Sequence, residues 1–597
     1  MPTTIEVNKQ SVEALLGSGK SKPFVIPEYQ RPYAWTDEQV ETLFEDLWDF
    51  TATSGGTERE SSYFLGSVVS YENEDGEQEI IDGQQRITSL FLLLRAIYTK
   101  LVATPASERT AEANNFIGKI EPTIWRTNKL TGMVDFKNIL LTSRVVNNEG
   151  NEILRSILET GKADEDAKDN YSKNYRHFQE LFDKHSTENP LMVYQFIYAL
   201  LNQAILLPIT ADTQDTALTI FSTLNDRGLP LSDADIFKAK IYNQLAPDDK
   251  KAFIDRWKDL DEQSTDANES IQQLFYYNMF YYRALDKDTK TTTPGVRKYY
   301  AVNKFERLYK PELLDTLFVI LNLWKVVNKG EELEAEAWSK NLKIRQTLDI
   351  LTSYPNEYWK YPVVIYYVCY RNEENFETRF ARFLNKLLME LMTKYLMIPT
   401  INAVKPDILK LNSAIVASDI PTFEFKTVDM TQLEPYIQNP NRNVVRMLLK
   451  TLAYEHQDDL LPAKWEIEHI FPQKWQTNYF PDEPDATIKE KIEHIGNKLP
   501  FEKKLNIVAG NGYFGKKKKE YIASKIVITK AMGTSDVMDW NLESITKRDI
   551  RVSDEVVKIM NRWNNEYLNT PVSEGKAGEP SEEELAQIEK FKKNGWI

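Results

Sequence analysis

The sequence predicts a multidomain α+β protein, and three observations along the chain lead to that prediction. Residues 1–240 mix short apolar runs typical of strands with amphipathic helical segments. Residues 241–430 carry apolar side chains at the three- and four-residue spacing of helices, which predicts a helical spacer. Residues 431–568 hold a compact module of short strands and helices, and residues 569–597, rich in Ser, Gly, Pro and Glu, are expected to form a flexible tail. At 597 residues the chain is long enough for several separate cores.

The first part contains a strand-to-helix corner made of Asp82, Gly83, Gln84, Gln85 and Arg86. An apolar run precedes this corner and a strongly apolar helical segment follows it. Free amides and the macrodipole at a helix N-terminus bind anions, Arg86 can add a bidentate phosphate contact, and Asp82 can hold Mg²⁺ or a water. The same residues also suit a tight turn in which Asp82 and Thr88 only cap the helix, and the corner alone leaves both interpretations open.

Two other segments of the first part carry polar motifs, and the first of them, residues 26–35, is too polar and too rigid for a plain linker. Residues 26–35 contain Tyr29, Gln30 and Arg31 between two prolines and further aromatic residues. Residues 221–236 read as a turn that leads into a helix, with Ser232 as N-cap and Asp235 as an imperfect capping-box partner. In the helical spacer, aromatic clusters such as residues 275–277 and 280–282 could stack bases, but at helical spacing they are expected to be core.

Residues 465–506 carry the polar groups of a one-metal nuclease. Phosphodiester hydrolysis needs a base that activates water and a cation that neutralises developing charge. We expect His469 to be the base, and Glu468 and the amide oxygen of Asn506 to bind Mg²⁺ or Mn²⁺. Glu468 and His469 can serve one site only if the strand kinks between them. Asn497 is then expected to orient His469, and His494 is the competing candidate for the base; a buried histidine in an ordinary α/β module is the alternative for the whole set.

The same segment reverses the charge of the chain. Residues 497–530 contain nine lysines and two glutamates, a local net of +7, in a chain whose formal net charge is −15. Such a run is often only a solvated face, but beside a nuclease centre it predicts contact with DNA phosphates. The residues expected to bind the nucleic acid are Lys498, Lys503, Lys504, Lys516, Lys517 and Lys518.

The segment from Glu468 to Asn506 resembles the HNH, or ββα-metal, nuclease finger. The resemblance implies metal binding by Glu468 and Asn506 and catalysis by His469 and Asn497, although the usual first ligand is Asp and not Glu. Together with the motifs of the first part, the order of motifs resembles the GmrSD-type type IV restriction enzymes. Their N-terminal domain is a ParB/sulfiredoxin-like NTPase marked by an Asp-Gly-Gln-Gln-Arg loop, and their C-terminal domain is an HNH nuclease.

This resemblance implies a nucleotide site and a DNA substrate. Residues Asp82 to Arg86 are then expected to bind and hydrolyse an NTP whose base the sequence does not specify, and Tyr29, Gln30 and Arg31 to line the same cleft or to sense a DNA modification. Asn225, Asp226 and Arg227 match a later loop of the family. The expected partner is double-stranded phage or modified DNA, and homo-oligomerisation stays open.

Composition adds the compartment and leaves alternatives for the function. The one cysteine, Cys369, lies in an apolar run and excludes a disulfide framework. The first residues lack the pattern of a signal peptide and no apolar run is long enough to span a bilayer, so a cytoplasmic protein without a membrane partner is expected. The predicted function is an NTP-regulated, Mg²⁺-dependent DNA endonuclease. An NTP-driven DNA-binding switch with a non-cleaving finger is the alternative, and an RNase toxin is a third.

Overall fold

The computed structural model describes residues 6–54, 61–128, 131, 133–145, 148–224, 232–426, 429–475 and 483–571. The predicted loop Asn225 to Arg227 and the tail from residue 572 lie outside these ranges. The chain forms two compact units. The first comprises Met1–Glu262 with Asn303–Tyr309, and the second comprises Gln263–Val302 with Lys310–Ile597.

A mixed seven-stranded sheet forms the centre of the first unit. The strand order is β1-β9-β4-β5-β3-β8, with β2 also paired to β9. β4 runs parallel to β9 and antiparallel to β5, and β3 runs parallel to both β5 and β8. A separate antiparallel pair joins β6 (Trp125–Thr127) to β7 (Val134–Ile139). The strands of the main sheet are β1 (Glu6–Val7), β2 (Gln10–Ser11), β3 (Phe24–Ile26), β4 (Tyr63–Glu72), β5 (Gln78–Asp82), β8 (Leu141–Ser143) and β9 (Ala204–Ala211).

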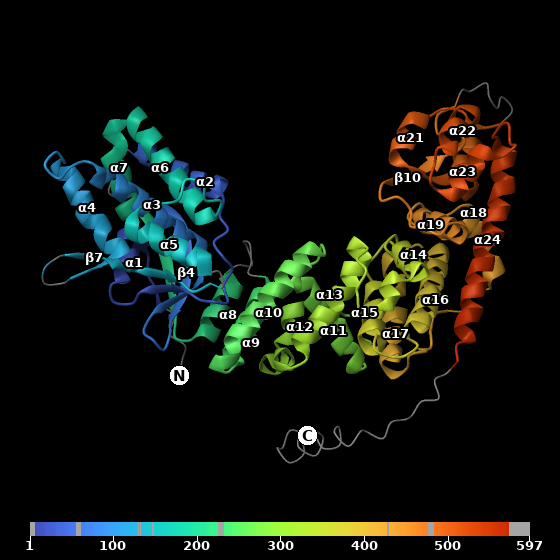
Figure 1. Ribbon diagram of the computed structural model, residues 1–597, viewed down its shortest axis with the longest axis horizontal. Helices are drawn as coiled ribbons and strands as arrows, with labels where there is room; N and C mark the ends of the chain where they lie inside the picture. The colour runs from blue at the N-terminus through green and yellow to red at the C-terminus, as the bar shows by residue number, and fades with distance from the viewer. Residues whose placement is uncertain are drawn as a thin grey trace, which may run out of the picture. The chain divides into compact units, whose positions relative to one another are not determined.

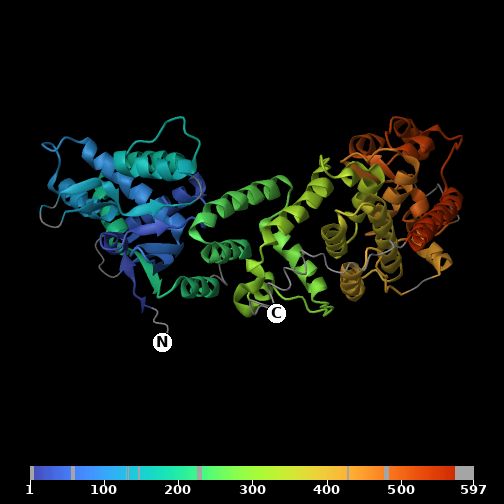
Figure 2. The same ribbon diagram turned by 60° about the horizontal axis from the view of Figure 1, so that its bottom comes forward.

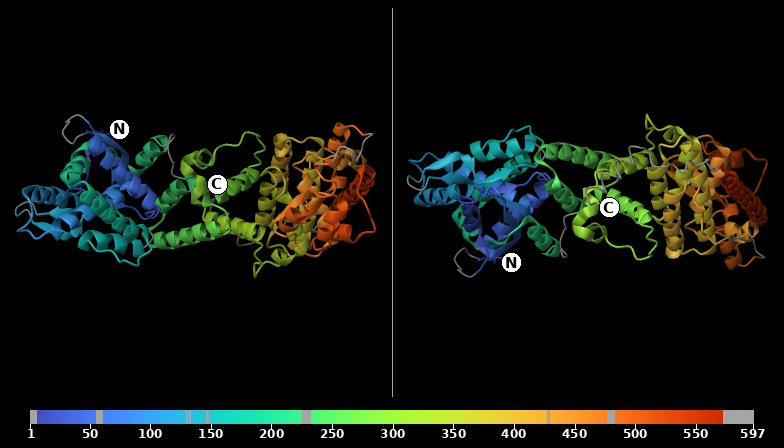
Figure 3. Two further views of the ribbon diagram at one scale, coloured as in Figure 1. Left: turned by 90° about the horizontal axis from the view of Figure 1, so that it is seen from above. Right: turned by 90° about the horizontal axis from the view of Figure 1, so that it is seen from below.

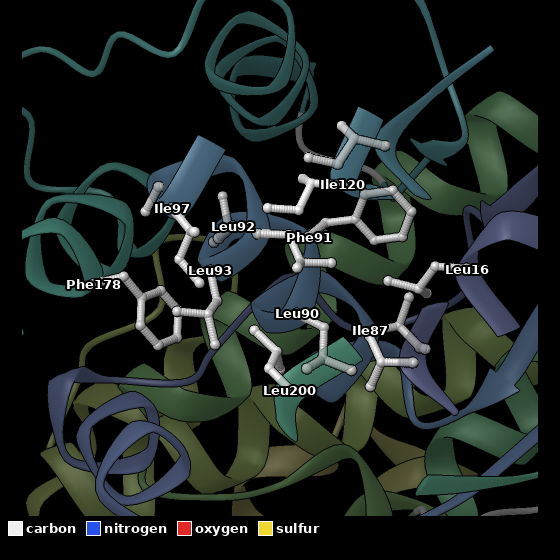
Figure 4. Packing of buried hydrophobic residues seen from close by; sticks show 14 of the residues in the cluster. Leu16, Ile87, Leu90, Phe91, Leu92, Leu93, Ile97, Ile120, Phe178 and Leu200 are labelled. Atoms are coloured by element: carbon white, nitrogen blue, oxygen red, sulfur yellow. The ribbon is translucent and has the colours of Figure 1, made fainter. Parts of the chain in front are cut away.

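Helices cover both faces of this sheet. Neighbouring strand residues point to opposite sides, and here apolar residues on both sides have to be buried. Ile80 belongs to the larger core, which is built around the buried helix α3 (Gln84–Ala103), whereas Ile81 packs with residues of α8 (Gln214–Leu224) and α9 (Asp233–Gln244). Figures 1 and 2 show the helices lying against the sheet, and Figure 4 shows α3 side chains meeting Ile120 and Phe178. The other helices are α1 (Val12–Ser18), α2 (Asp37–Ser54), α4 (Ala111–Ile124), α5 (Asn148–Thr160), α6 (Asn170–Glu188), α7 (Val193–Tyr198) and α10 (Pro247–Asp266).

The polar composition of residues 147–173 predicts an exposed loop or insertion, and the structure corrects this prediction, because helix α5 forms over Asn148–Thr160. Its overall polarity hides an apolar stripe at helical spacing. Ile153, Leu154, Ile157 and Leu158 follow that spacing, and the last three are buried in the core of the first unit.

The described part of the second unit is helical up to residue 464. Its aromatic clusters are mainly core, as expected: Tyr277 is buried and stacks on Trp324 with ring centroids 4.9 Å apart, and Phe280 stacks on Tyr361. Cys369 is a free, half-buried thiol. The helices are α11 (Ile271–Leu285), α12 (Val296–Tyr300), α13 (Leu313–Lys329), α14 (Leu342–Leu351), α15 (Lys360–Tyr370), α16 (Phe376–Met397), α17 (Lys405–Ala417), α18 (Glu434–Gln438) and α19 (Val445–His456).

In the described residues, a small two-stranded antiparallel sheet and the helices around it complete the second unit. β10 (Trp465–His469) pairs antiparallel with β11 (Lys498–Glu502), and these elements form the orange to red end of the chain in Figure 3. The long helix α24 runs past α16, α18 and α19 (Figure 1). Within the described residues, no helix combines the length and the apolar character that crossing a bilayer requires. The described helices around these two strands are α20 (Asp485–Ile492), α21 (Lys503–Ala509), α22 (Phe514–Ile522), α23 (Val527–Thr534) and α24 (Leu542–Leu568).

Candidate functional site

The first candidate site is a cavity of about 420 Å³ at the end of strand β5. β5 ends at Asp82, Gly83 takes the left-handed conformation with φ 86°, and α3 begins at Gln84. Because glycine has no side chain with which to cap the helix, the first-turn N–H groups of α3 receive no side-chain cap. The cavity is lined by residues from all three predicted motifs of the first part, namely Gln30, Arg31, Trp35, Ile81, Asp82, Gly83, Gln84, Gln85, Arg86, Phe221, Ser232 and Asp235.

The charged groups of this cavity are partly desolvated. Burial raises the pKa of Asp82, against the opposing effects of the Gly83 N–H and of Arg86 and Arg31. Burial also lowers the pKa of Arg86, whose Nη1 donates to the Ser67 carbonyl at 3.0 Å. An anion in the cavity would therefore meet two guanidinium groups and an uncapped helix N-terminus in a partly desolvated site.

Two residues that were predicted to contact a ligand, Tyr29 and Gln85, use their polar groups for hydrogen bonds within the protein. Tyr29 is not among the lining residues; it is buried, and its hydroxyl donates to Glu79 at 2.5 Å and accepts from Gln214 at 2.7 Å. Gln85 lines the cavity, but its amide is bonded to backbone atoms of Pro32, Ala34 and Trp35. It fixes the 26–35 segment against α3. The capping box of Ser232 and Asp235 is fully formed at the start of α9.

The second candidate site surrounds His469, the last residue of β10. The ring is largely buried, with 16% of its side chain exposed. Among the described residues its Nε2 atom has no hydrogen-bond partner, although it lies 3.5 Å from Glu493 Oε1. Burial lowers the pKa of His469; Glu493 opposes this shift, and Lys498 reinforces it. The imidazole is therefore held neutral at pH 7, with a free nitrogen that can accept a proton.

The strand is regular at this point, which corrects the predicted kink. Glu468 pairs with Leu499 and His469 with Lys498 in continuous register, so the two side chains point to opposite faces. Glu468 is buried against α22, where its Oε1 atom lies 2.8 Å from Lys517 Nζ and accepts from the Tyr521 hydroxyl at 2.6 Å. Its negative charge is already compensated by a lysine.

The expected magnesium ligands do not come together. Asn506 donates to Glu466 Oε2 at 3.2 Å and not toward Glu468. Within the described ranges no group of three or more His, Cys, Asp and Glu side chains is placed to hold a metal ion. This arrangement of Glu468 and Asn506 therefore does not fit the predicted metal pair.

Asn497 and His494 also differ from their predicted roles. Asn497 is fully buried, and its side chain bonds Phe471 through both its oxygen and its nitrogen, at 2.6 and 3.1 Å. It fixes the chain two residues after His469 without touching the ring. His494 Nδ1 lies 2.8 Å from the buried Asp549 of α24, which ties it to a separate polar cluster.

Two family models match this chain. The model of the GmrSD restriction endonuclease N-terminal domain matches residues 12–242. The model of the GmrSD restriction endonuclease C-terminal domain matches residues 429–552. The chain belongs to the GmrSD restriction endonuclease family. The two matches include both candidate sites, so the GmrSD assignment covers the cavity beside Asp82 and the surroundings of His469. Because restriction endonucleases act on DNA, membership of this family implies a DNA substrate. No curated protein matches it.

The predicted DNA-binding lysines of this GmrSD chain divide into three groups by their exposure. Lys503, Lys504 and Lys516 are exposed, and Lys503 also forms a solvent-exposed ion pair with Glu466 at 3.4 Å. Lys517 and Lys498 are buried and bonded inside the protein, Lys517 to Glu468 and Lys498 to Glu493, which corrects the prediction for both. The half-buried Lys518 donates to the carbonyls of Ser535 and Val537.

Sequence reasoning missed Glu493 and the inward direction of Lys517 at the second candidate site. Glu493 approaches His469 from the turn after α20, and no pattern in the sequence indicates it. The inward direction of Lys517 did leave a signal: Phe514, Lys517 and Tyr521 follow helical spacing, and both aromatic residues are fully buried.

Proposed function

We propose that this GmrSD-family chain is an NTP-regulated DNA endonuclease of the type IV restriction kind, which cleaves modified or invading phage DNA. In this proposal a ParB/sulfiredoxin-like first domain binds and hydrolyses the NTP, and an HNH module in the second unit cuts the DNA. The observation that carries the nuclease half is His469, a neutral and largely buried imidazole with an unbonded Nε2 atom inside the matched C-terminal domain.

The chemistry of His469 follows from its surroundings. Nε2 takes a proton from the attacking water, and the imidazolium that forms is stabilised by the adjacent Glu493 carboxylate. The exposed Lys503, Lys504 and Lys516 neutralise backbone phosphates and position the DNA. Asn497 acts as a positioning residue, because it fixes Phe471 and with it the end of β10.

The cavity beside Asp82 supports the nucleotide half. It joins an uncapped helix N-terminus, two arginines and a carboxylate, and it is large enough for a small polar ligand. Arg31 and Arg86 supply charge for the phosphates, while Gly83 lets the backbone approach them.

Cleavage of plasmid and phage DNA in the presence of Mg²⁺ and each NTP tests the nuclease half. Loss of a general base lowers rates by ~10²–10⁴, so His469→Ala should show no measurable cutting and retain NTP hydrolysis. His456→Ala is the matched control, because His456 is a half-exposed histidine of the same unit, bonded to Glu555. Undiminished cutting by His469→Ala would refute this base, and loss in His494→Ala alone would transfer the role to His494.

The alternative, an NTP-driven DNA-binding switch without cleavage, has one observation in its favour. Glu468 is neutralised by Lys517, so the carboxylate expected to serve the nuclease is engaged elsewhere. The same experiment separates the two functions: a switch binds DNA in an NTP-dependent way and leaves every DNA substrate intact.

Regulation by the nucleotide is tested with Arg86→Ala. Coupling between two sites amounts typically to ~1–3 kcal/mol, or roughly a 5- to 150-fold change in binding. We expect the effect of NTP on cleavage to disappear in Arg86→Ala and to persist in Arg155→Ala, whose guanidinium is exposed on α5 of the same unit. An NTP effect of equal size in both variants would exclude Arg86 from the coupling.

A further inference from the structure

The second unit contains a cavity of about 460 Å³ that shares no lining residue with the cavity beside Asp82. It lies between α19, α23 and α24, which contact one another near the red end of the chain in Figure 1. Most of the residues that line it are apolar, among them Leu452 of α19, Met532 of α23 and Val552 of α24. Its volume and its apolar lining are typical of pockets that hold small organic ligands.

Two arginines of α24 line this cavity, and neither forms an ion pair within the described residues. Arg548 is 8% exposed and Arg551 is exposed. Two acidic residues of the same helix are engaged elsewhere: Asp549 pairs with Lys491 and His494, and Glu555 pairs with His456. A buried charge without a compensating partner is unfavourable, so the two arginines favour an anion in the cavity.

Only one nitrogen of the Arg548 guanidinium is used by the protein. Nη1 donates to the carbonyls of Ile495, Gly496 and Lys498 at 3.2, 2.8 and 2.8 Å. Nε and Nη2 have no hydrogen-bond partner among the described residues, although a guanidinium offers N–H donors on all three nitrogens. Burial lowers the pKa of Arg548 to about 10, and the charge of Arg551 adds to this shift. Arg548 therefore stays charged at pH 7, and the carbonyl dipoles around Nη1 supply no net negative charge.

From this arrangement we infer a binding site for a small organic anion with an apolar body. Its carboxylate, sulfonate or phosphate group meets Arg548 and Arg551, and its apolar part packs against α19, α23 and α24. Guanidinium groups bind the paired oxygens of such anionic groups through parallel N–H donors. Charge complementarity favours the anion over a neutral ligand, and the apolar lining favours an organic anion over a free inorganic ion.

Occupancy of this cavity would act on the turn that carries Asn497. Arg548 bonds carbonyls on both sides of Asn497, and the lining residue Trp540 donates through Nε1 to Asn497 Oδ1 at 3.2 Å. Asn497 in turn fixes Phe471, two residues after His469. A ligand held by the walls of the cavity therefore stabilises this turn, which makes the cavity a regulatory site of the second unit. Binding of the ligand does not depend on the proposed nuclease chemistry.

Titration of the full chain with anilinonaphthalene sulfonate, a fluorescent aromatic sulfonate, tests the site without any activity. Arg551→Met removes the exposed charge, and Ala531→Trp fills the cavity from α23. Lys558→Met and Thr546→Trp are the matched controls, because both residues are exposed on α24 and neither lines the cavity. We expect Arg551→Met to weaken binding about tenfold or more, the loss that follows removal of a charge-assisted hydrogen bond. Ala531→Trp should abolish this binding, and both controls should bind as the wild type does.

Competition with unlabelled compounds tests the chemical class of the ligand. Naphthalene-1-sulfonate should displace the probe at a concentration about tenfold or more below that needed for the neutral naphthalene-1-methanol or for inorganic sulfate. Equal displacement by the neutral compound would overturn the anion, and unchanged probe binding in Arg551→Met or in Ala531→Trp would overturn the location. If a DNA duplex in EDTA displaces the probe and Arg551→Met weakens duplex binding, the arginines contact DNA phosphates and the inference of a small ligand is wrong.

Hydrogen exchange measured by mass spectrometry tests the link to the turn. Saturating naphthalene-1-sulfonate should slow amide exchange across residues 495–498 in the wild type and leave it unchanged in Ala531→Trp. Unchanged exchange in the wild type would show that the ligand does not stabilise the turn and would overturn the regulatory role. A failure of the His469 variants to lose cleavage would refute the proposed nuclease base and would leave all of these binding results in force.

Discussion

Replacement of Lys517 by Met gives a strong test of the structure around the candidate nuclease site. The side chains of Lys517 and Glu468 are 2% and 5% exposed, and Lys517 Nζ lies 2.8 Å from Glu468 Oε1. Lys517 also donates to the His469 carbonyl, and the Tyr521 hydroxyl donates to the same Glu468 oxygen. If Lys517 instead pointed outward to DNA, its charge would matter for binding and hardly for folding.

The magnitude follows from the burial of the pair. Met keeps the apolar length of Lys517 but leaves the Glu468 charge buried with the Tyr521 hydroxyl. Removing one partner of a buried ion pair typically costs ~3–5 kcal/mol, whereas replacing the whole pair by apolar residues of similar volume is often neutral or stabilising. We therefore expect a loss of this size in Lys517→Met and recovery of most of it in the double variant Glu468→Met/Lys517→Met.

Urea unfolding, followed by tryptophan fluorescence and circular dichroism, measures the effect on the transition of the second unit. Lys519→Met is the control, because Lys519 is exposed on the same helix, and a surface change of this kind is expected to stay within about 0.5 kcal/mol. If Lys517→Met is as stable as Lys519→Met, or if the double variant recovers nothing, the buried ion pair is refuted.

Three further outcomes are expected. Neutral His469 is the active form, so the cleavage rate should fall as the pH drops through the lowered pKa of His469. In a pH–rate profile, Glu493→Gln should move this acidic limb to lower pH and Lys498→Met should move it to higher pH. Shifts of both variants in the same direction would contradict the assignment. Gly66 has φ 114°, and an added Cβ atom would lie 2.9 Å from the Arg86 guanidinium. Gly66→Ala should therefore weaken NTP binding about tenfold or more in a fluorescence titration. An unchanged affinity would show that Arg86 does not hold the phosphates. A triple alanine variant replaces the exposed Lys503, Lys504 and Lys516. Each lost phosphate contact reduces the magnitude of the slope of log K against log salt by ~0.9, so this slope should become about 2 to 3 less steep. An unchanged slope would place the DNA elsewhere.

The sequence alone determined the local elements around the cavity beside Asp82. The apolar run before Asp82, the glycine after it and the apolar helix beyond predicted a strand-to-helix corner, and β5 and α3 form it. The spacing of Ser232 and Asp235 predicted the capped start of α9. These features depend on backbone conformation and on contacts over a few residues, and such preferences are encoded locally.

Tertiary structure alone decided which polar groups face a ligand and which face the protein. Four consecutive lysines, residues 516–519, point in different directions around α22, so one of them has to lie on the buried face with Phe514 and Tyr521. Lys517 takes this position because Glu468 lies opposite and compensates its charge. On β10, the absence of a kink separates Glu468 from His469, and Glu493 reaches the histidine from a distant turn. Burying a charge or an amide is tolerated only where a partner meets it, and that partner is supplied by packing between segments far apart in the chain.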